Sequence, residues 1–212
     1  MYKAIVFDFD GVILNSSGFR EEAYIRLFSN IGINVTPERL RAKAGMTTRD
    51  TISRIAGGYA KKGKKPLNVN GLCRRFYYEL YNIYEERSEP SPHLTNFLNY
   101  CEARKWKIGL ACSTPSNIVR MVLKKFGLMK YFMAIVGGEK VVADKPNPEM
   151  LLKVLGKLDA KPEDSIAIDG SLKGIIAAKL IGMYAISYLR YSKTVIPQAD
   201  LSVCDFDDIT GL

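Results

Sequence analysis

Histidine is almost absent from this chain of 212 residues, with His93 as its single representative. One imidazole excludes a histidine-rich metal site, and a hydrolytic triad would depend on this one residue. The prolines around it, in residues 89–93, are typical of a loop, so we interpret His93 as an ordinary surface or hinge residue. Catalytic chemistry in this chain is therefore expected to use carboxylates, hydroxyls and lysine.

Cysteine and long apolar runs are also scarce. The four cysteines are scattered without a C-x-x-C pair, which argues against a zinc knuckle or a disulfide scaffold and fits a reducing compartment. No run approaches the ~20 apolar residues of a membrane span. The first apolar run, residues 4–7, ends at once in Asp8 and Asp10, so a secretory signal is not expected. We expect a cytoplasmic protein with no membrane partner.

The charge is positive and unevenly distributed. The formal net charge is +9, and residues 15–88 alone carry 14 lysines and arginines against 7 acidic residues. Such a field attracts anions. The lysine cluster at residues 61–65 lacks interleaved aromatic residues, so it indicates a solvated loop and no nucleic-acid partner is expected.

Short apolar runs alternate with helix-period segments over much of the chain. The runs predict buried strands at residues 4–7, 107–112, 133–136, 165–168 and 183–187. The helical segments between them are residues 117–126, 148–158 and 172–181. Asn147 and Pro148 resemble a helix start, and Gly127 and Gly182 stand at expected helix ends. This alternation predicts an α/β fold with a parallel sheet.

The alternation is interrupted after the first strand. Residues 15–88 contain no convincing strand, and their helix-period segments are residues 21–31, 37–44, 49–55 and 72–86. Thr36 stands at the expected start of one of these helices. We therefore predict a core domain made of residues 1–14 and 89–212, with residues 15–88 as a helical insertion.

Polar side chains collect at the carboxyl ends of the predicted strands, where open α/β sheets bind their ligands. The residues expected to meet there are Asp8, Asp10, Gly11, Ser113, Thr114, Lys145 and Asp169. An Asp-x-Asp pair places two carboxylates on one side of an extended chain. Two such anions need a cation between them or a proton on one of them.

Phosphoryl transfer uses both solutions. Mg2+ prefers oxygen ligands, which Asp8, Asp10 and Asp169 offer. Asp8 is then the predicted nucleophile, and Asp10 the acid that protonates the leaving group and later accepts a proton from water. Lys145 would add positive charge beside the phosphoryl oxygens.

Three smaller residues complete the predicted phosphate site. Gly11 would let the backbone turn tightly beside the phosphate. The hydroxyls and backbone N–H groups near Ser113 and Thr114 would bind the phosphoryl oxygens that Lys145 does not reach.

Four segments in this order resemble the haloacid dehalogenase-like hydrolase superfamily, in the branch with phosphoglycolate phosphatase and β-phosphoglucomutase. The segments are residues 7–14, 111–115, 144–149 and 169–179. The resemblance implies a Rossmann-like core, a mobile helical cap at residues 15–88 and Mg2+ dependence. It also implies that Asp10 separates this chain from the dehalogenases, and that residues 45–49 are a specificity loop whose Arg49 contacts a distal anionic group or starts a helix.

Some positions depart from the family pattern. Cys112 stands where a phosphate-binding hydroxyl is usual, Gly170 where a second acid is usual, and Asn15 where aspartate is common. Cys112 and Gly170 keep open a catalytically weak relative that binds phosphorylated ligands or a partner. A sugar phosphomutase is a further alternative, although Arg20 and Gly45 stand roughly where its histidine and lysine would be.

The sequence thus predicts a Mg2+-dependent phosphatase acting on a small phosphorylated metabolite, and nothing in it indicates an oligomeric state.

Overall fold

The computed structural model describes residues 2–42, 46–61, 65–192 and 194–209. The chain forms two compact units, one joining Met1–Ser17 to Ser88–Leu212 and the other formed by Gly18–Arg87. We call them the core unit and the helical unit. Gly45 and Lys62–Lys64, which the sequence analysis considered, lie outside the described residues. The assignment of residues 15–88 to a cap domain stays a prediction. None of the described helices is both long and apolar enough to cross a membrane.

The core unit is built on a six-stranded sheet with the order β3-β2-β1-β4-β5-β6, and every pair of neighbours is parallel. The strands are β1 (Ala4–Phe7), β2 (Lys107–Cys112), β3 (Ala134–Gly137), β4 (Ser165–Asp169), β5 (Tyr184–Tyr188) and β6 (Leu201–Val203). The predicted α/β fold with a parallel sheet is confirmed. The sequence analysis missed β6, because a strand of three residues at a sheet edge has no distinct apolar run.

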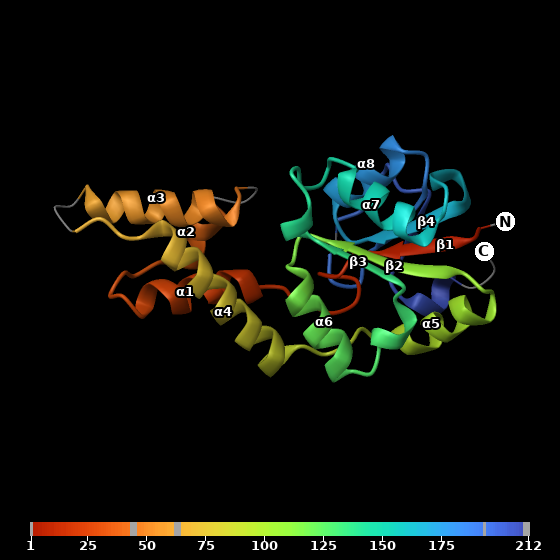
Figure 1. Ribbon diagram of the computed structural model, residues 1–212, viewed down its shortest axis with the longest axis horizontal. Coiled ribbons are helices and arrows are strands. Elements are labelled where there is room, and N and C mark those ends of the chain that lie inside the picture. Colours follow the sequence, from red (N-terminus) through yellow and green to blue (C-terminus); the bar gives the residue numbers. More distant parts are fainter. Residues whose placement is uncertain (1, 43–45, 62–64, 193, 210–212) are drawn as a thin grey trace. The chain divides into compact units, whose positions relative to one another are not determined.

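Helices cover both faces of this sheet, with α7 and α8 on one side and α5 and α6 on the other (Figure 1). The helices are α5 (Leu94–Ala103), α6 (Ser116–Lys125), α7 (Glu149–Leu158) and α8 (Leu172–Leu180), with short 3-10 turns η1 (Met129–Tyr131), η2 (Gly138–Lys140), η3 (Pro162–Asp164) and η4 (Phe206–Ile209). Of the helices, α5 was not predicted. Because both faces are covered, all four residues of β1 are buried.

Alternate residues of β1 pack into two different cores. Val6 belongs to an aliphatic cluster that includes Met150 and Val154 of α7 and Ile175 of α8. Phe7 points to the other face, where its ring lies 6.0 Å from Phe97, 6.1 Å from Phe132 and 6.2 Å from Phe206. Packing against these two cores fixes the position of β1 along the sheet, and therefore the position of Asp8, which follows the end of this strand.

The predicted helix ends are close to those observed. Gly127 and Gly182 follow α6 and α8 with φ values of 67° and 83°, the left-handed conformation that glycine adopts without strain. At α7 the N-cap position is Pro148 rather than Asn147, one residue later than predicted. The Asn147 side chain still accepts a hydrogen bond from Glu149 N–H at 2.9 Å, so it satisfies a free donor of the first turn.

The helical unit contains α1 (Phe19–Ser29), α2 (Pro37–Arg41), α3 (Thr48–Ala60) and α4 (Val69–Arg87), and no strand among its described residues. Its core lies mainly between α1 and α4, where Tyr24 stacks near Phe76 with ring centroids 4.4 Å apart. The α3 helix continues five residues beyond the predicted segment, through Gly57 and Gly58. Glycine weakens a helix locally, which is why the pattern suggested an earlier end.

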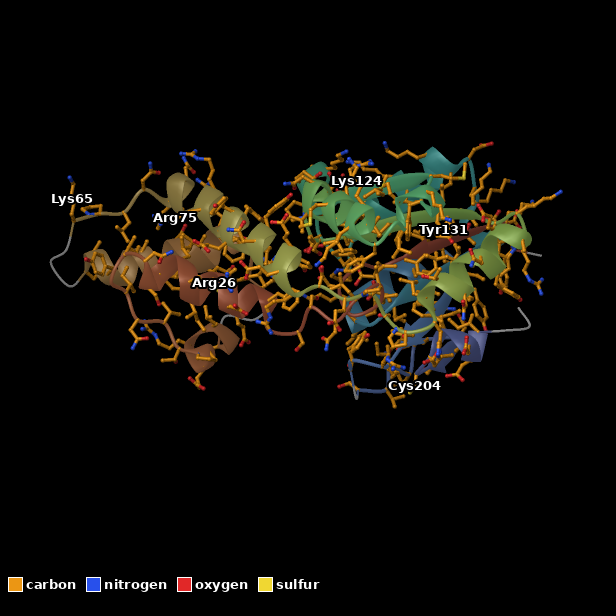
Figure 2. The ribbon with its side chains drawn as sticks, turned by 90° about the horizontal axis from the view of Figure 1, so that it is seen from below. Arg26, Lys65, Arg75, Lys124, Tyr131 and Cys204 are labelled. Carbon is orange, nitrogen blue, oxygen red and sulfur yellow. The ribbon has the colours of Figure 1, made fainter. Side chains whose placement is uncertain are left out.

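Basic side chains of the helical unit differ in their partners. Figure 2 shows Arg26, Lys65 and Arg75 on this unit. Arg26 pairs with Glu22 at 2.7 Å and with Glu86 at 3.2 Å, whereas Lys65 and Arg75 are exposed to solvent. The positive charge predicted for this segment is therefore carried in part by solvated side chains.

Candidate active site

Neighbouring strands of the core unit end beside one another and deliver the predicted site residues to one edge of the sheet. Asp8 follows β1, and its N–H donates to Ile168 O of β4 at 2.8 Å. Asp169 is the last residue of β4, and Cys112 the last residue of β2. Lys145 lies between β3 and α7 and reaches the same edge through its side chain.

The ammonium group of Lys145 joins these segments. Its Nζ donates to Asp8 Oδ1 at 2.9 Å, to Asp169 Oδ2 at 2.8 Å and to Ala111 O at 2.9 Å. An ammonium has three N–H bonds, so each has an acceptor. The side chains of Lys145, Asp8 and Asp169 are only 7, 12 and 5% exposed, so water screens these charges little.

Burial and neighbouring charges shift the pKa values of Asp8 and Lys145. Burial first, and then the negative charges of Asp169 and Asp10, raise the pKa of Asp8 to about 7 against the opposing charge of Lys145. Burial alone would lower the pKa of Lys145, but the carboxylates of Asp169 and Asp8 outweigh it and hold that pKa above its ordinary value. Lys145 is therefore charged at neutral pH, whereas Asp8 keeps its proton to a higher pH than an ordinary aspartate does.

The donor set at this edge fits a hard divalent cation. The carboxylates of Asp8, Asp10 and Asp169 outnumber the single ammonium of Lys145, and after burial the charges of Asp169 and Asp10 contribute to the raised pKa of Asp8. An added cation would relieve this excess of negative charge, and carboxylate oxygens are the ligands that Mg2+ prefers. The candidate metal ligands are thus chemically suited to Mg2+.

Asp169 is held by the start of α8. Its Oδ1 accepts hydrogen bonds from Ser171 N at 2.8 Å and from Ser171 Oγ at 2.7 Å. The same Ser171 Oγ accepts from Gly174 N at 3.1 Å and so caps the helix. The sequence analysis predicted neither the contact of Ser171 with Asp169 nor its role as the N-cap of α8. A serine just before an apolar helical segment is nevertheless a recognisable capping signal.

The loop after β2 uses its hydroxyls on protein acceptors. Thr114 Oγ1 donates to Asp10 Oδ2 at 2.6 Å. Ser113 Oγ donates to Asp144 Oδ1 at 2.6 Å, and that oxygen also accepts from Lys145 N at 2.8 Å. Ser113 and Thr114 therefore lie where they were predicted, but their hydroxyl protons point to carboxylates of the chain. The role of Asp144 left no signal in the sequence.

The departures from the family pattern have structural correlates. Cys112 is buried, and its thiol donates to Thr114 O at 3.3 Å. Burial, and then the charges of Asp8 and Asp10, raise the pKa of this thiol, so it stays protonated. At Gly170 an added Cβ would lie 3.2 Å from Gly11 O and 3.3 Å from Tyr188 O. A larger residue there needs a small shift of two backbone carbonyls.

Gly11 and Arg49 complete the predicted residues. Gly11 has a φ of 79°, and its N–H donates to Leu14 O at 2.9 Å, so the chain turns tightly after Asp10. Arg49 belongs to the helical unit, in the first turn of α3, and donates to Asn70 Oδ1 at 2.8 Å. In the same unit Arg20 donates to Thr48 Oγ1 at 2.6 Å.

A parallel sheet with an Asp-x-Asp segment, a buried lysine and a further aspartate at its carboxyl edge is the arrangement that the sequence analysis predicted for a phosphoryl-transfer hydrolase. Residues 5–187 match the haloacid dehalogenase-like hydrolase family, and the chain belongs to it. The family resemblance inferred from the four motifs is therefore confirmed.

Several known proteins align with most of this chain. The present sequence is 28% identical over 181 residues to the phosphorylated carbohydrates phosphatase of Thermotoga maritima, and the alignment covers 85% of this chain and 82% of the relative. It is 29% identical over 142 residues to phosphoglycolate phosphatase of Salmonella typhimurium, covering 65 and 55% of the two chains. The solved β-phosphoglucomutase of Clostridium difficile shares the fold with a TM-score of 0.79 at 22% identity, covering 100 and 94%.

Proposed function

We propose that this protein is a Mg2+-dependent phosphatase that hydrolyses a small phosphorylated metabolite through an aspartyl-phosphate on Asp8. The observation that carries the proposal is the buried bridge in which Lys145 Nζ contacts both Asp8 and Asp169 at the carboxyl edge of the sheet. A buried ion cluster of this kind is costly for stability, which favours a catalytic explanation for it.

In the first step, Asp8 attacks phosphorus. Lys145 holds Asp8 Oδ1 at 2.9 Å, which orients the carboxylate and directs Oδ2 to the phosphorus atom. The new bond joins Asp8 Oδ2 to phosphorus, and the bond from phosphorus to the ester oxygen breaks. Bound Mg2+, held by Asp8, Asp10 and Asp169, would neutralise charge on the phosphoryl group.

Asp10 acts as the general acid and then as the general base. It gives a proton to the oxygen of the departing alcohol as the ester bond breaks, and its carboxylate then takes a proton from the water that attacks the aspartyl-phosphate. Hydrolysis releases inorganic phosphate and restores Asp8. Lys145 stays charged throughout and stabilises negative charge on the phosphoryl oxygens.

The name of one relative supports a proposal for the substrate class. The Thermotoga relative is named for phosphorylated carbohydrates, so we propose a phosphorylated sugar or a similarly small metabolite as the substrate in the cytoplasm. The helical unit is assigned the role of a cap that contributes specificity, with Arg49 as a candidate for contact with a second anionic group.

The decisive experiment compares the wild type with Asp8→Asn on p-nitrophenyl phosphate and on a panel of sugar phosphates. We expect phosphate release that needs Mg2+, stops in EDTA and is lost in Asp8→Asn. Asp159→Asn is the matched control, because Asp159 is exposed and has a left-handed φ of 47° that asparagine tolerates. Full activity in Asp8→Asn or in EDTA contradicts the proposal.

The same substrate panel distinguishes the proposed phosphatase from two alternative functions. A phosphomutase, suggested by the fold shared with β-phosphoglucomutase, would move phosphate between sugar hydroxyls, which 31P NMR of the product mixture detects. Cys112 and the crowded Gly170 favour a weak enzyme that mainly binds phosphorylated ligands. That alternative predicts no phosphate release across the panel, together with a rise in melting temperature on adding a phosphorylated sugar.

A further inference from the structure

We infer that Thr114 is a positioning residue that orients the general acid Asp10, rather than a ligand of the substrate phosphate. The inference rests on the proposed phosphatase function and deepens it. Its starting point is the 2.6 Å hydrogen bond from Thr114 Oγ1 to Asp10 Oδ2. Thr114 is only 1% exposed and Asp10 is half-buried, so the Thr114 hydroxyl is shielded from competition with water.

The backbone of Thr114 is fixed independently of any substrate. Its carbonyl oxygen accepts the thiol hydrogen of Cys112 at 3.3 Å. On the other side, a Cβ added to Gly137 would lie 2.8 Å from the same carbonyl, so β3 approaches the loop closely. Cys112, which replaces a usual hydroxyl, thereby gains a role of its own, because it helps to hold the residue that contacts Asp10.

The other hydroxyls of this loop follow the same pattern. Ser113 Oγ donates to Asp144 Oδ1 at 2.6 Å, and Ser116 donates to Glu139 through both its N–H and its Oγ. A hydroxyl has one proton to donate. A phosphate could accept the hydroxyl proton only if these hydrogen bonds to carboxylates were broken. The hydroxyls of Ser113, Thr114 and Ser116 therefore hold carboxylates of the chain in place rather than a substrate.

These hydrogen bonds distinguish the two carboxyl oxygens of Asp10. The three N–H bonds of Lys145 are directed at Asp8, Asp169 and Ala111 O, so Lys145 does not hold Asp10. Thr114 donates to Oδ2, whose second lone pair remains for Mg2+, and the transferable proton belongs to Oδ1. When the ester bond to phosphorus breaks, the Oδ1–H bond also breaks. The proton joins the departing oxygen, and the electron pair of that bond stays on Asp10.

The test uses two substrates that differ in their need for an acid. The phenolate of phenyl phosphate is a poor leaving group and benefits from protonation, whereas that of p-nitrophenyl phosphate needs it little. Thr114→Val is close in shape but has no hydroxyl, and Thr114→Ser keeps the hydroxyl. We expect Thr114→Val to lower kcat/KM for phenyl phosphate about tenfold more than for p-nitrophenyl phosphate, since general acids contribute about 100-fold or more. Thr114→Ser should keep the wild-type ratio.

Equal losses on both substrates, or a loss confined to KM, would overturn the inference, because a phosphate ligand or a purely structural residue acts on both substrates alike. Should Thr114→Val fail to fold in a melting experiment, the smaller Thr114→Ala carries the same comparison. Asp10→Asn serves as the reference for complete loss of the acid. Absence of phosphate release by the wild type contradicts the proposed function itself, and is thus distinguishable from failure of the inference.

Discussion

Gly174 and Asp169 are in such close contact that a Cβ atom added to Gly174 would lie 1.8 Å from Asp169 Oδ2. The carboxylate therefore occupies the space of a missing side chain in the first turn of α8. Ser171 holds one of its oxygens and Lys145 the other. The absence of a side chain at position 174 is thus a requirement of the charged cluster and not of the helix.

The first prediction concerns Gly174→Ala. Alanine is the better helix former by about 1 kcal/mol, yet here it must displace Asp169 from Lys145. We expect loss of phosphatase activity by about 10- to 100-fold, together with weaker metal binding. Gly156→Ala in α7 is the matched control, because an added Cβ meets nothing within 4 Å there, and it should stabilise the protein at full activity. Equal activity in the two variants would show that Asp169 does not depend on this space.

The second prediction concerns Gly170, where the usual second acid is missing. Gly170→Asp should tighten Mg2+ binding about tenfold or more, as measured by calorimetric titration, because it adds a carboxylate to the donor set. Gly170→Ala isolates the steric effect of a Cβ 3.2 Å from Gly11 O. If both variants bind Mg2+ like the wild type, position 170 takes no part in the metal site.

The third prediction is a pH dependence set by Asp8. Its pKa is raised from 3.8 to about 7, first by burial and then by Asp169 and Asp10, so the folded protein binds this proton more tightly than the unfolded chain. The penalty for ionising Asp8 therefore grows as the pH rises from about 4 through 7. In EDTA, the stability of Asp8→Asn relative to the wild type should increase between pH 5.5 and 8, by on the order of 2 kcal/mol.

Thermal and urea unfolding at these two pH values measure the effect, with Asp159→Asn as the control that shows no such trend. A constant difference between Asp8→Asn and the wild type would mean that Asp8 titrates normally in the folded protein.

The fourth prediction concerns His93, whose contribution to stability also depends on pH but favours the folded wild type at low pH. The hydrogen bond that His93 donates to Asp205 and the charges of Asp205 and Asp207 raise the pKa of His93 above its ordinary 6.5. The protonated form therefore stabilises the fold below that value, and the contribution is lost as the pH rises through the folded pKa. His93→Asn, which tolerates the left-handed φ of 58°, should melt below the wild type at pH 5.5 and approach it at pH 9.

Added salt should reduce the gap in melting temperature between His93→Asn and the wild type at pH 5.5, because the side chain of His93 is 49% exposed. A gap that is the same at both pH values would exclude an ionic role for His93.

Much of this arrangement could be read from the sequence, because it depends on local patterns. Five of the six strands match short apolar runs, and Gly127 and Gly182 end helices as expected. Strand β6 and helix α5 were missed. The site residues Asp8, Lys145 and Asp169 were predicted to converge, and in the structure one ammonium bridges the two carboxylates.

The sequence alone determined which residues stand at the ends of the strands, since the order of apolar runs and the carboxyl edge of a parallel sheet follow from chain-local chemistry. Only the tertiary structure decided where the protons of Ser113 and Thr114 point and that Asp169 fills the space above Gly174. The two hydroxyl contacts join residues far apart in the chain at 2.6 Å, whereas Asp169 and Gly174 are close in sequence and meet because of how α8 begins. All three relationships depend on how the strands and helices pack, which no spacing in the sequence encodes.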